Sequence, residues 1–396
     1  MRAEGRCVYA IPIMVWADDV SGNVSKQWNK HLCVTFSNLA LPRQQLEQEC
    51  NIHFVGTSTH TSSLELMEGL VRMIEEMNSV GREAFDVVSK APVLLLTWIA
   101  ILAGDNPMQG EMCCSKGMQA NKFCRRCHAG GNLKYRRSEA GYASLFETGI
   151  LRQRDETAAH VREMLSLAAA PGRRAALQRY STTYGIRDTY AEPVLEQLQE
   201  HTKNIEADAD LDEADAQELL AEARMTLGAA FAINPLLRLT HLDPHLSTPV
   251  EILHTFLLGL VKYLWGATVE YLEAPAKKVP GRPLQPLAAR SLALLQTRLA
   301  SLNEYGWKQP KLQPMYLVQH KKQLIGKHLK QLAQCMPFVI EDLVSEPLLE
   351  AWVLVGLATP LLWTTSIRDS TAYVVRVSSS FLAPYHRNPP PPLPRP

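Results

Sequence analysis

The feature that most constrains the fold is the apolar run from Pro92 to Ala103, PVLLLTWIAILA, which ends at Gly104-Asp105. A run of this length without a charge has the pattern of a central strand covered on both faces. A buried helix is the alternative, because periodicity does not distinguish the two for a run this short. As a strand, the run predicts a layered α/β protein.

Three shorter segments before this run have the composition of strands. Residues 7–17 (CVYAIPIMVWA) are rich in branched and aromatic side chains and are followed by Asp18-Asp19 and a Ser-Gly-Asn turn. Residues 32–39 and 52–57 predict two more strands, and we expect the three to be antiparallel neighbours. A helix is predicted over 61–77, with one apolar face made by Leu64, Met67, Leu70, Val71 and Ile74.

The rest of the chain has mainly helical composition. Residues 135–227 are rich in Ala, Leu, Glu, Arg and Gln, with candidate breaks at Pro171-Gly172 and Gly185. Within them, residues 205–223 carry eight acidic residues and no basic one, which indicates a solvated helix face or a flexible link.

Further helices are expected towards the C-terminus. A helix is predicted over 249–271 with Thr248 as its N-cap. The segments after it are predicted as a Pro-rich linker (275–287), two helical blocks (288–303 and 318–343) and an apolar block (348–363). The expected domains are therefore 1–128, a helical insertion at 129–248, a helical region at 249–375 and a disordered Pro-rich tail at 376–396.

Bulk composition narrows the class of protein. The formal net charge of the 396 residues is +1, so binding to nucleic acid would need local basic patches. The eight cysteines follow no disulfide framework and no secretory signal opens the chain, which favours a reducing compartment, the cytosol or the nucleus. No membrane span is predicted, because residues 91–104 are too few and residues 348–363 contain Glu350 and Pro360.

Acidic residues follow two of the predicted strands. Asp18 and Asp19 come after the first strand, and Asp105 comes after the central one. Carboxylates delivered by neighbouring strand ends can converge on Mg²⁺ or Mn²⁺, and a metal pair stabilises both the attacking and the leaving oxygen in phosphoryl transfer. The alternative is that each aspartate caps a turn or a helix.

A second candidate site is the pair Cys124-x-x-Cys127, which is followed by His128. In a reducing compartment this spacing is typical of zinc binding or of redox activity. A structural zinc site needs about four ligands. The candidates for the other two are His245 and His254, with His241 and His128 as substitutes. The alternative is that the cysteines are free core thiols.

Basic residues cluster in three places. They are Arg125-Arg126, the segment Lys134-Tyr135-Arg136-Arg137, and HKKQLIGKHLK at 320–330. The last of these would place Lys321, Lys322, Lys327 and Lys330 on one side of a helix that could follow a phosphate backbone. The alternative is an ordinary solvated helix face.

Four motifs resemble one family. They are DDVSGNVSKQWNKH at 18–31, GDNPMQ at 104–109, KFCRRC at 122–127, and DPH at 243–245 with TPVEILH at 248–254. In order and approximate spacing they resemble the transposases of CACTA-like fungal elements of the Plavaka group, allied to the Kyakuja–Dileera–Zisupton elements. The resemblance covers about residues 8–375.

The resemblance implies a DNA transposase of the DD[E/D] type acting in the nucleus, with a ribonuclease-H-like mixed sheet interrupted by a helical insertion. Asp18 or Asp19 would be the first metal-binding carboxylate and Asp105 the second. Zn²⁺ would tie the insertion to the core through Cys124, Cys127, His245 and His254. The partners of such a transposase would be the transposon ends and the target DNA, together with further copies of the protein if it self-associates.

The third acidic residue of a DD[E/D] site cannot be assigned to a motif as directly as the first two. Glu251 is the candidate within the later motif, whereas the family's pattern continues into a further His-rich, Glu-containing segment that this chain does not show. We therefore expect a chain truncated at both ends, with weak or no strand-transfer activity. A non-catalytic, transposon-derived DNA-binding or interaction protein is the main alternative. A redox protein built on the Cys pair is a further one, but Lys-Phe-Cys-Arg-Arg-Cys lacks the strand–CxxC–helix context.

Overall fold

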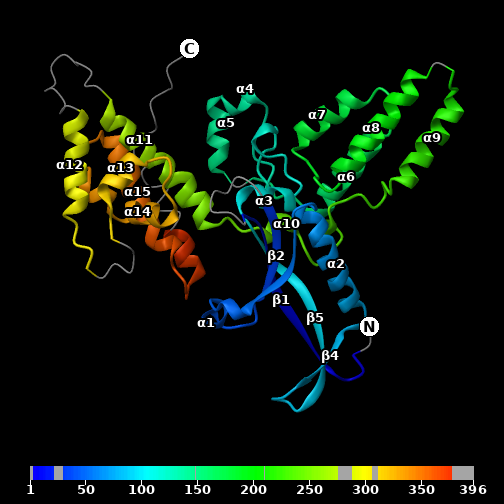
Figure 1. Ribbon diagram of the computed structural model, residues 1–396, viewed down its shortest axis with the longest axis horizontal. Helices are drawn as coiled ribbons and strands as arrows, with labels where there is room; N and C mark the ends of the chain where they lie inside the picture. Colours follow the sequence, from blue (N-terminus) through cyan, green and yellow to red (C-terminus); the bar gives the residue numbers. More distant parts are fainter. Residues whose placement is uncertain are drawn as a thin grey trace. The chain divides into compact units, whose positions relative to one another are not determined.

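The computed structural model describes residues 3–21, 30–147, 149–208, 210–274, 288–305 and 311–376. The chain divides into two compact units, Met1–Pro249 and Val250–Pro396 (Figure 1). Most of the first motif, the predicted Pro-rich linker and nearly all of the predicted tail lie outside the described residues. Both helices and a mixed sheet are present, so the α/β class is confirmed.

The first unit is built on a five-stranded mixed sheet with the order β3-β2-β1-β5-β4. The strands are β1 (Cys7–Ser21), β2 (Lys30–Asn38), β3 (Ile52–Ser58), β4 (Arg82–Asp86) and β5 (Ala91–Ala103). β1, β2 and β3 are antiparallel neighbours, as predicted, and β5 runs parallel to β1. The strand interpretation of the long apolar run is thus confirmed. The short edge strand β4, antiparallel to β5, was not predicted.

Helix α2 (Ser63–Val80) covers one face of this sheet (Figure 1). Ser62 and Glu65 form a capping box at its start, which satisfies the first free backbone N–H groups. The predicted apolar face of α2 is buried against Ile13, Val15, Val34, Ile99 and Leu102 of the sheet. The prediction that both faces of the central strand are covered is wrong in part, since Trp16 and Trp98 on the sheet are more than a third exposed.

A few short helical elements lie between the strands, and most helices of the first unit come after β5. Between β2 and β3 lie α1 (Arg43–Leu46) and the 3₁₀ turn η1 (Glu49–Asn51). After β5 come α3 (Asn106–Met112), η2 (Gly117–Gln119), α4 (Leu133–Arg136), α5 (Glu139–Ala143), η3 (Ser144–Phe146), α6 (Arg154–Ala168), α7 (Arg174–Tyr184), α8 (Glu192–Ala207), α9 (Glu213–Thr226), η4 (Pro235–Leu237) and α10 (Pro244–Ser247). The predicted breaks are confirmed: α6 and α7 are separated at Pro171-Gly172, and Gly185 ends α7 in the left-handed conformation that favours glycine.

The second unit is helical. Its elements are the π-helical segment η5 (Ile252–Val261), α11 (Lys262–Glu273), α12 (Ala288–Ala300), α13 (Pro314–Gln319), α14 (Gly326–Val339) and α15 (Glu346–Leu362). They share one core, in which Trp265 and Trp352 are fully buried. Two predictions need correction. Glu251, not Thr248, caps the helix that begins at Ile252, and the predicted helix at 318–343 is interrupted at residues 320–325.

Candidate metal and nucleic-acid site

The C-terminal end of β5 lies beside β1, five residues before β1 itself ends. Their parallel register runs to the pair Trp16–Ala103. A Cβ atom added at Gly104 would lie 2.9 Å from the Ala17 carbonyl oxygen, so only glycine allows the two backbones to approach this closely. Asp105 therefore follows the end of β5, beside the stretch of β1 that carries Asp18.

Asp18 and Asp19 are neighbours on β1, so their side chains have opposite phases in the sheet. Ile13, Val15 and Ala17 alternate into the core, so Asp19 has the phase of the buried side chains and Asp18 has the other phase. In a parallel pair, residues at the same level point to the same side of the sheet. Counting on by two residues from the last pair, Trp16–Ala103, reaches Asp18 and Asp105, so Asp18 is the aspartate that we expect nearer to Asp105.

The aspartates lie within β1, not beyond its end. The predicted strand stopped at residue 17, whereas β1 continues to Ser21 because β2 goes on pairing with it, with Asp18 opposite Cys33 and Asp19 opposite Leu32. Asp18 and Asp19 are both exposed. The Asp18 Oδ1 accepts a hydrogen bond of 2.8 Å from the backbone N–H of Asp19.

Asp105 is half-buried and begins helix α3. Its Oδ1 accepts a hydrogen bond of 2.8 Å from the Met108 N–H, so the capping role weighed as an alternative is present. Capping leaves a carboxylate able to bind a cation through its remaining lone pairs. The Asp105 side chain is thereby held in one orientation at the edge of the sheet.

Arg125 reaches this edge from the Cys124–Cys127 turn. Its Nη1 donates to Asn106 Oδ1 at 3.1 Å, and its Nη2 donates to Gln109 Oε1. Gln109 is buried, and its amide donates to the Pro249 carbonyl at 2.9 Å. A guanidinium is thus fixed one residue along from Asp105, a contact that the sequence did not predict.

Buried polar side chains hold the Cys124–Cys127 turn. The Arg152 guanidinium is 3% exposed and donates to the carbonyls of Lys122, Cys124 and Tyr184 at 2.8–3.0 Å. Burial raises the pKa of Cys127, and the neighbouring Cys124 thiol raises it further. The turn is therefore fixed through its backbone, with both thiols half-buried.

His245 lies against the same turn but has protein partners on both ring nitrogens. Nδ1 is 2.7 Å from the Arg125 carbonyl oxygen and Nε2 is 2.8 Å from the Thr157 hydroxyl. Because a carbonyl only accepts, Nδ1 donates, and the neutral ring accepts from Thr157. Burial lowers the pKa of His245, which favours this neutral form. In this arrangement both ring nitrogens of His245 make hydrogen bonds that support the turn.

Glu251 and His254 belong to the second unit. Glu251 accepts hydrogen bonds from the N–H groups of Leu253 and His254, and its Oε1 lies 2.7 Å from His254 Nδ1. These two residues therefore bind each other at the start of η5. Within the described parts of both units, no three His, Cys, Asp or Glu side chains are grouped closely enough to hold a metal ion.

A cluster of titratable groups beside the Cys turn was not predicted. Glu156 lies 3.1 Å from His128 Nε2 and 3.6 Å from His160 Nε2, and His160 Nδ1 is 2.7 Å from the Tyr180 hydroxyl. Burial lowers the pKa of both histidines, and Glu156 opposes this. The spacing of Glu156 and His160, one helical turn apart on α6, was a signal for their contact.

The basic residues predicted to contact DNA do not form one stripe. Lys321 and Lys322 lie between α13 and α14, while Lys327 and Lys330 lie on α14. Lys321 pairs with Glu273 at 2.7 Å and Lys330 lies over the ring of Trp363. Of the residues Arg125, Arg126, Lys321, Lys322, Lys327 and Lys330, the exposed ones are Arg126, Lys322 and Lys327.

No protein-family model and no curated protein matches this chain. By length and composition alone, the helical stretch Ile252–Glu273 could cross a membrane, with a mean hydropathy of 1.4 in its most apolar window. A third of that window is buried, and the core helix of a soluble protein passes the same test.

Proposed function

We propose that this chain is the core of a metal-dependent DNA transposase, or a relic that keeps more of the fold than of the chemistry. The four motifs at 18–31, 104–109, 122–127 and 243–254 support this through their resemblance to CACTA-like transposases. Three antiparallel strands, then a helix and, after the short strand β4, a strand parallel to the first support a ribonuclease-H-like interpretation of the sheet. Residues 129–248, which contain the helices from α4 to α10, would then be the insertion.

The observation that carries the proposal is the approach of β1 and β5 at Ala17 and Gly104. It brings two acidic residues that are 87 positions apart (105 − 18) to one edge of the sheet. Neighbouring carboxylates are hard oxygen donors of the kind that Mg²⁺ and Mn²⁺ prefer. Asp18 and Asp105 are therefore the residues that would hold the cation.

Each group around this edge has a part in such a site. A bound Mg²⁺ or Mn²⁺ would activate water and stabilise a leaving oxygen in phosphoryl transfer. The α3 cap orients Asp105. Arg125 provides a fixed positive charge beside Asp105, where a phosphodiester would have to lie. Arg126 is the exposed candidate of the first unit for a contact with the DNA backbone, and Lys322 and Lys327 are separate candidates on the second unit.

We expect the activity to be weak or absent. Two carboxylates give a cation fewer ligands and less charge than three. Glu251, the candidate third acid, is engaged with His254 and the helix start. The second candidate function is therefore a non-catalytic DNA-binding protein. Zinc binding at Cys124 and Cys127 stays a prediction, and the phosphoryl transfer proposed at Asp18 and Asp105 does not require it.

Nicking of supercoiled plasmid DNA by the purified protein in Mg²⁺ or Mn²⁺ tests the proposal. Asp105→Asn is the informative variant, because asparagine also caps helices and removes only the charge. Asp212→Asn is its matched control, since Asp212 caps α9 in the same way. The proposal predicts that Asp105→Asn abolishes nicking and that Asp212→Asn does not.

Equal nicking by the wild type and Asp105→Asn would remove Asp105 from a catalytic role. Absence of nicking by the wild type, with DNA binding that Lys322→Ala and Lys327→Ala weaken, would favour the non-catalytic function. Absence of both nicking and DNA binding would contradict both candidate functions.

A further inference from the structure

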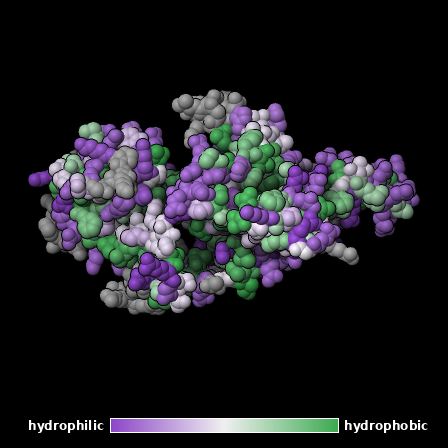
Figure 2. Space-filling view, turned by 90° about the horizontal axis from the view of Figure 1, so that it is seen from below, coloured by the Kyte–Doolittle hydropathy of each residue, from purple (hydrophilic) through white to green (hydrophobic). Residues whose placement is uncertain are grey.

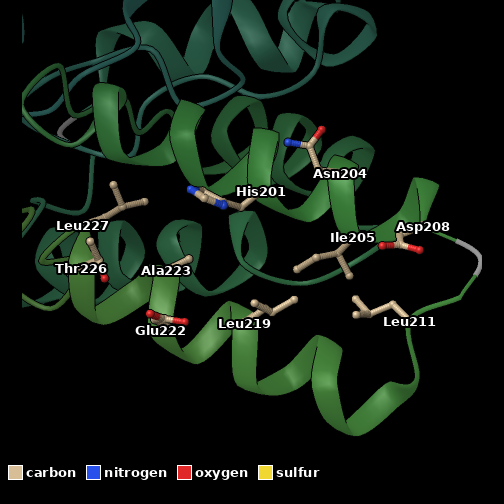
Figure 3. A pocket seen from close by; sticks show the side chains of 10 residues that line it. All are labelled: His201, Asn204, Ile205, Asp208, Leu211, Leu219, Glu222, Ala223, Thr226 and Leu227. Carbon is tan, nitrogen blue, oxygen red and sulfur yellow. The ribbon is translucent and has the colours of Figure 1, made fainter.

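Helices α8 and α9 enclose a groove in the first unit. Its volume is about 430 Å³, and Figure 3 shows the side chains of Ile205, Leu211 and Leu219 pointing into the gap between the two helices. Ala223 and Leu227 continue the apolar lining. Leu219 is 44% exposed, although it lies on the side of α9 that faces α8. The helix pair therefore leaves part of its apolar contact surface open.

The carboxylates in and next to this groove are acidic residues of one segment of the chain. Residues 205–223 contain eight acidic residues and no basic one, and all eight acidic side chains are exposed. Asp208 and Glu222 line the groove itself. The nearest cations along the chain, Lys203 and Arg224, are not among its lining residues. Figure 2 shows this end of the unit, at the right, as mostly hydrophilic surface with apolar residues between.

We propose that the α8–α9 groove is a docking site for a basic amphipathic helix of another protein. An apolar floor with an acidic rim matches a helix with aliphatic side chains on one face and Lys or Arg on its flanks. Binding would cover the exposed apolar surface and bring opposite charges together around it. This proposal is independent of the proposed function, because it uses no residue of the β1–β5 edge.

The charge argues for this occupant over a second copy of the chain. Two copies meeting through this groove would bring two segments of eight negative charges against each other. Like charges facing each other across an interface cost free energy and act against self-association. A basic partner instead gains from the same charges, by an amount that falls with ionic strength.

A labelled helix-forming peptide of Leu and Lys, with Leu at i, i+3, i+4 and i+7, is the probe. Its binding to the full-length protein would be followed by fluorescence anisotropy in about 0.15 M salt. Leu219→Lys places a positive charge on the groove floor. Met225→Lys is its control, because it adds the same charge to an exposed apolar position of α9 that does not line the groove.

The proposal predicts that Leu219→Lys weakens binding at least about tenfold, while Met225→Lys changes it about twofold or less. Asp208→Asn with Glu222→Gln, which leaves the floor intact, should also weaken binding. A peptide of the same composition with its order shuffled should bind less tightly. Circular dichroism of each variant checks that the helices remain.

Three outcomes would overturn the proposal. Equal weakening by Leu219→Lys and Met225→Lys would mean that charge alone attracts the peptide. Equal binding of the shuffled peptide would mean that no apolar face is recognised. A wild-type dimer in sedimentation that Leu219→Lys alone converts to a monomer would mean that a second copy occupies the groove.

Discussion

Two buried side chains determine the conformation of the Cys124–Cys127 turn. Arg152 binds three carbonyl groups of this region and His245 binds a fourth. His245 could be selected from the sequence because it stands in a motif, but its role was predicted as a metal ligand. Arg152 could not be selected, because no local pattern distinguishes a buried arginine from a solvated one.

Arg152→Lys should loosen the turn. Lysine cannot reach three carbonyls with one fixed fork of donors, and each lost hydrogen bond to a charged donor is worth about 1.5–3 kcal/mol. We expect alkylation of Cys124 and Cys127, mapped by mass spectrometry, to become at least about tenfold faster. Arg154→Lys, on the neighbouring helix start, is the control. Unchanged rates at both cysteines would show that Arg152 does not hold the turn.

His245 makes the stability of the first unit depend on pH. Burial lowers its pKa in the folded state, so the unfolded chain binds the proton more readily. The contribution of neutral His245 to the free energy of unfolding is therefore complete above the pKa of an unfolded histidine, about 6.5. It is lost as the pH falls from there through the lower pKa of the folded state. Urea unfolding should show this decline in the wild type.

His245→Gln should be less stable at pH 8 and should decline less below pH 6.5. The pKa values of His128, His160 and His241 are also lowered by burial, so some decline will remain. An identical pH profile in the wild type and in His245→Gln would contradict the assigned protonation state of the ring.

At the scale of elements, the sequence predicted those with strong local signals. β1, β2, β3, β5 and α2 followed from composition, period and capping residues. β4 was missed because its five residues, REAFD, carry no such pattern and pair only through β5. The split between α13 and α14 was missed because the lysines were counted as one helical face.

The candidate site was predictable only in part, because its contacts join segments that are far apart in the sequence. Strand ends with aspartates can be read from the sequence, whereas the contact of Arg125 with Asn106 depends on tertiary folding between separate segments. The choice between Asp18 and Asp19 likewise needed the register of β1 with β5.

Gly104→Ala tests the approach of the two strands. The added methyl group would lie 2.9 Å from the Ala17 carbonyl, so the strands must separate, at a cost of about 1–3 kcal/mol. Gly110→Ala is the matched control, since nothing lies within 4 Å of its added Cβ and α3 should gain up to about 1 kcal/mol. Urea denaturation measures both. Equal stability of the two variants would show that Gly104 is not in close contact.

At the scale of the whole molecule, the buried residues form separate cores. Two of these cores lie in the first unit, around the β1–β5 sheet and around α6 and α8, and the third lies in the second unit. No residue belongs to more than one of them among the described residues. Because the chain divides into two compact units and the core of the second shares no residue with those of the first, we expect the two units to unfold as separate cooperative transitions.

Core substitutions should shift these transitions one at a time. Leu198→Ala in α8 and Leu329→Ala in α14 each remove a fully buried side chain, which costs about 2–5 kcal/mol. Differential scanning calorimetry should show one transition lowered by the first and the other lowered by the second. A single transition that both substitutions lower equally would contradict two independently stable units.

We propose that Asp18 and Asp105 bind one cation together, and Mn²⁺ affinity followed by electron paramagnetic resonance tests this most directly. Asp18→Asn and Asp105→Asn should each weaken binding about tenfold or more, and the double variant should lose little more than either, because both remove the same site. Asp19→Asn should bind Mn²⁺ as the wild type does. Undiminished binding in Asp18→Asn and Asp105→Asn, or equal losses in Asp18→Asn and Asp19→Asn, would contradict the shared site.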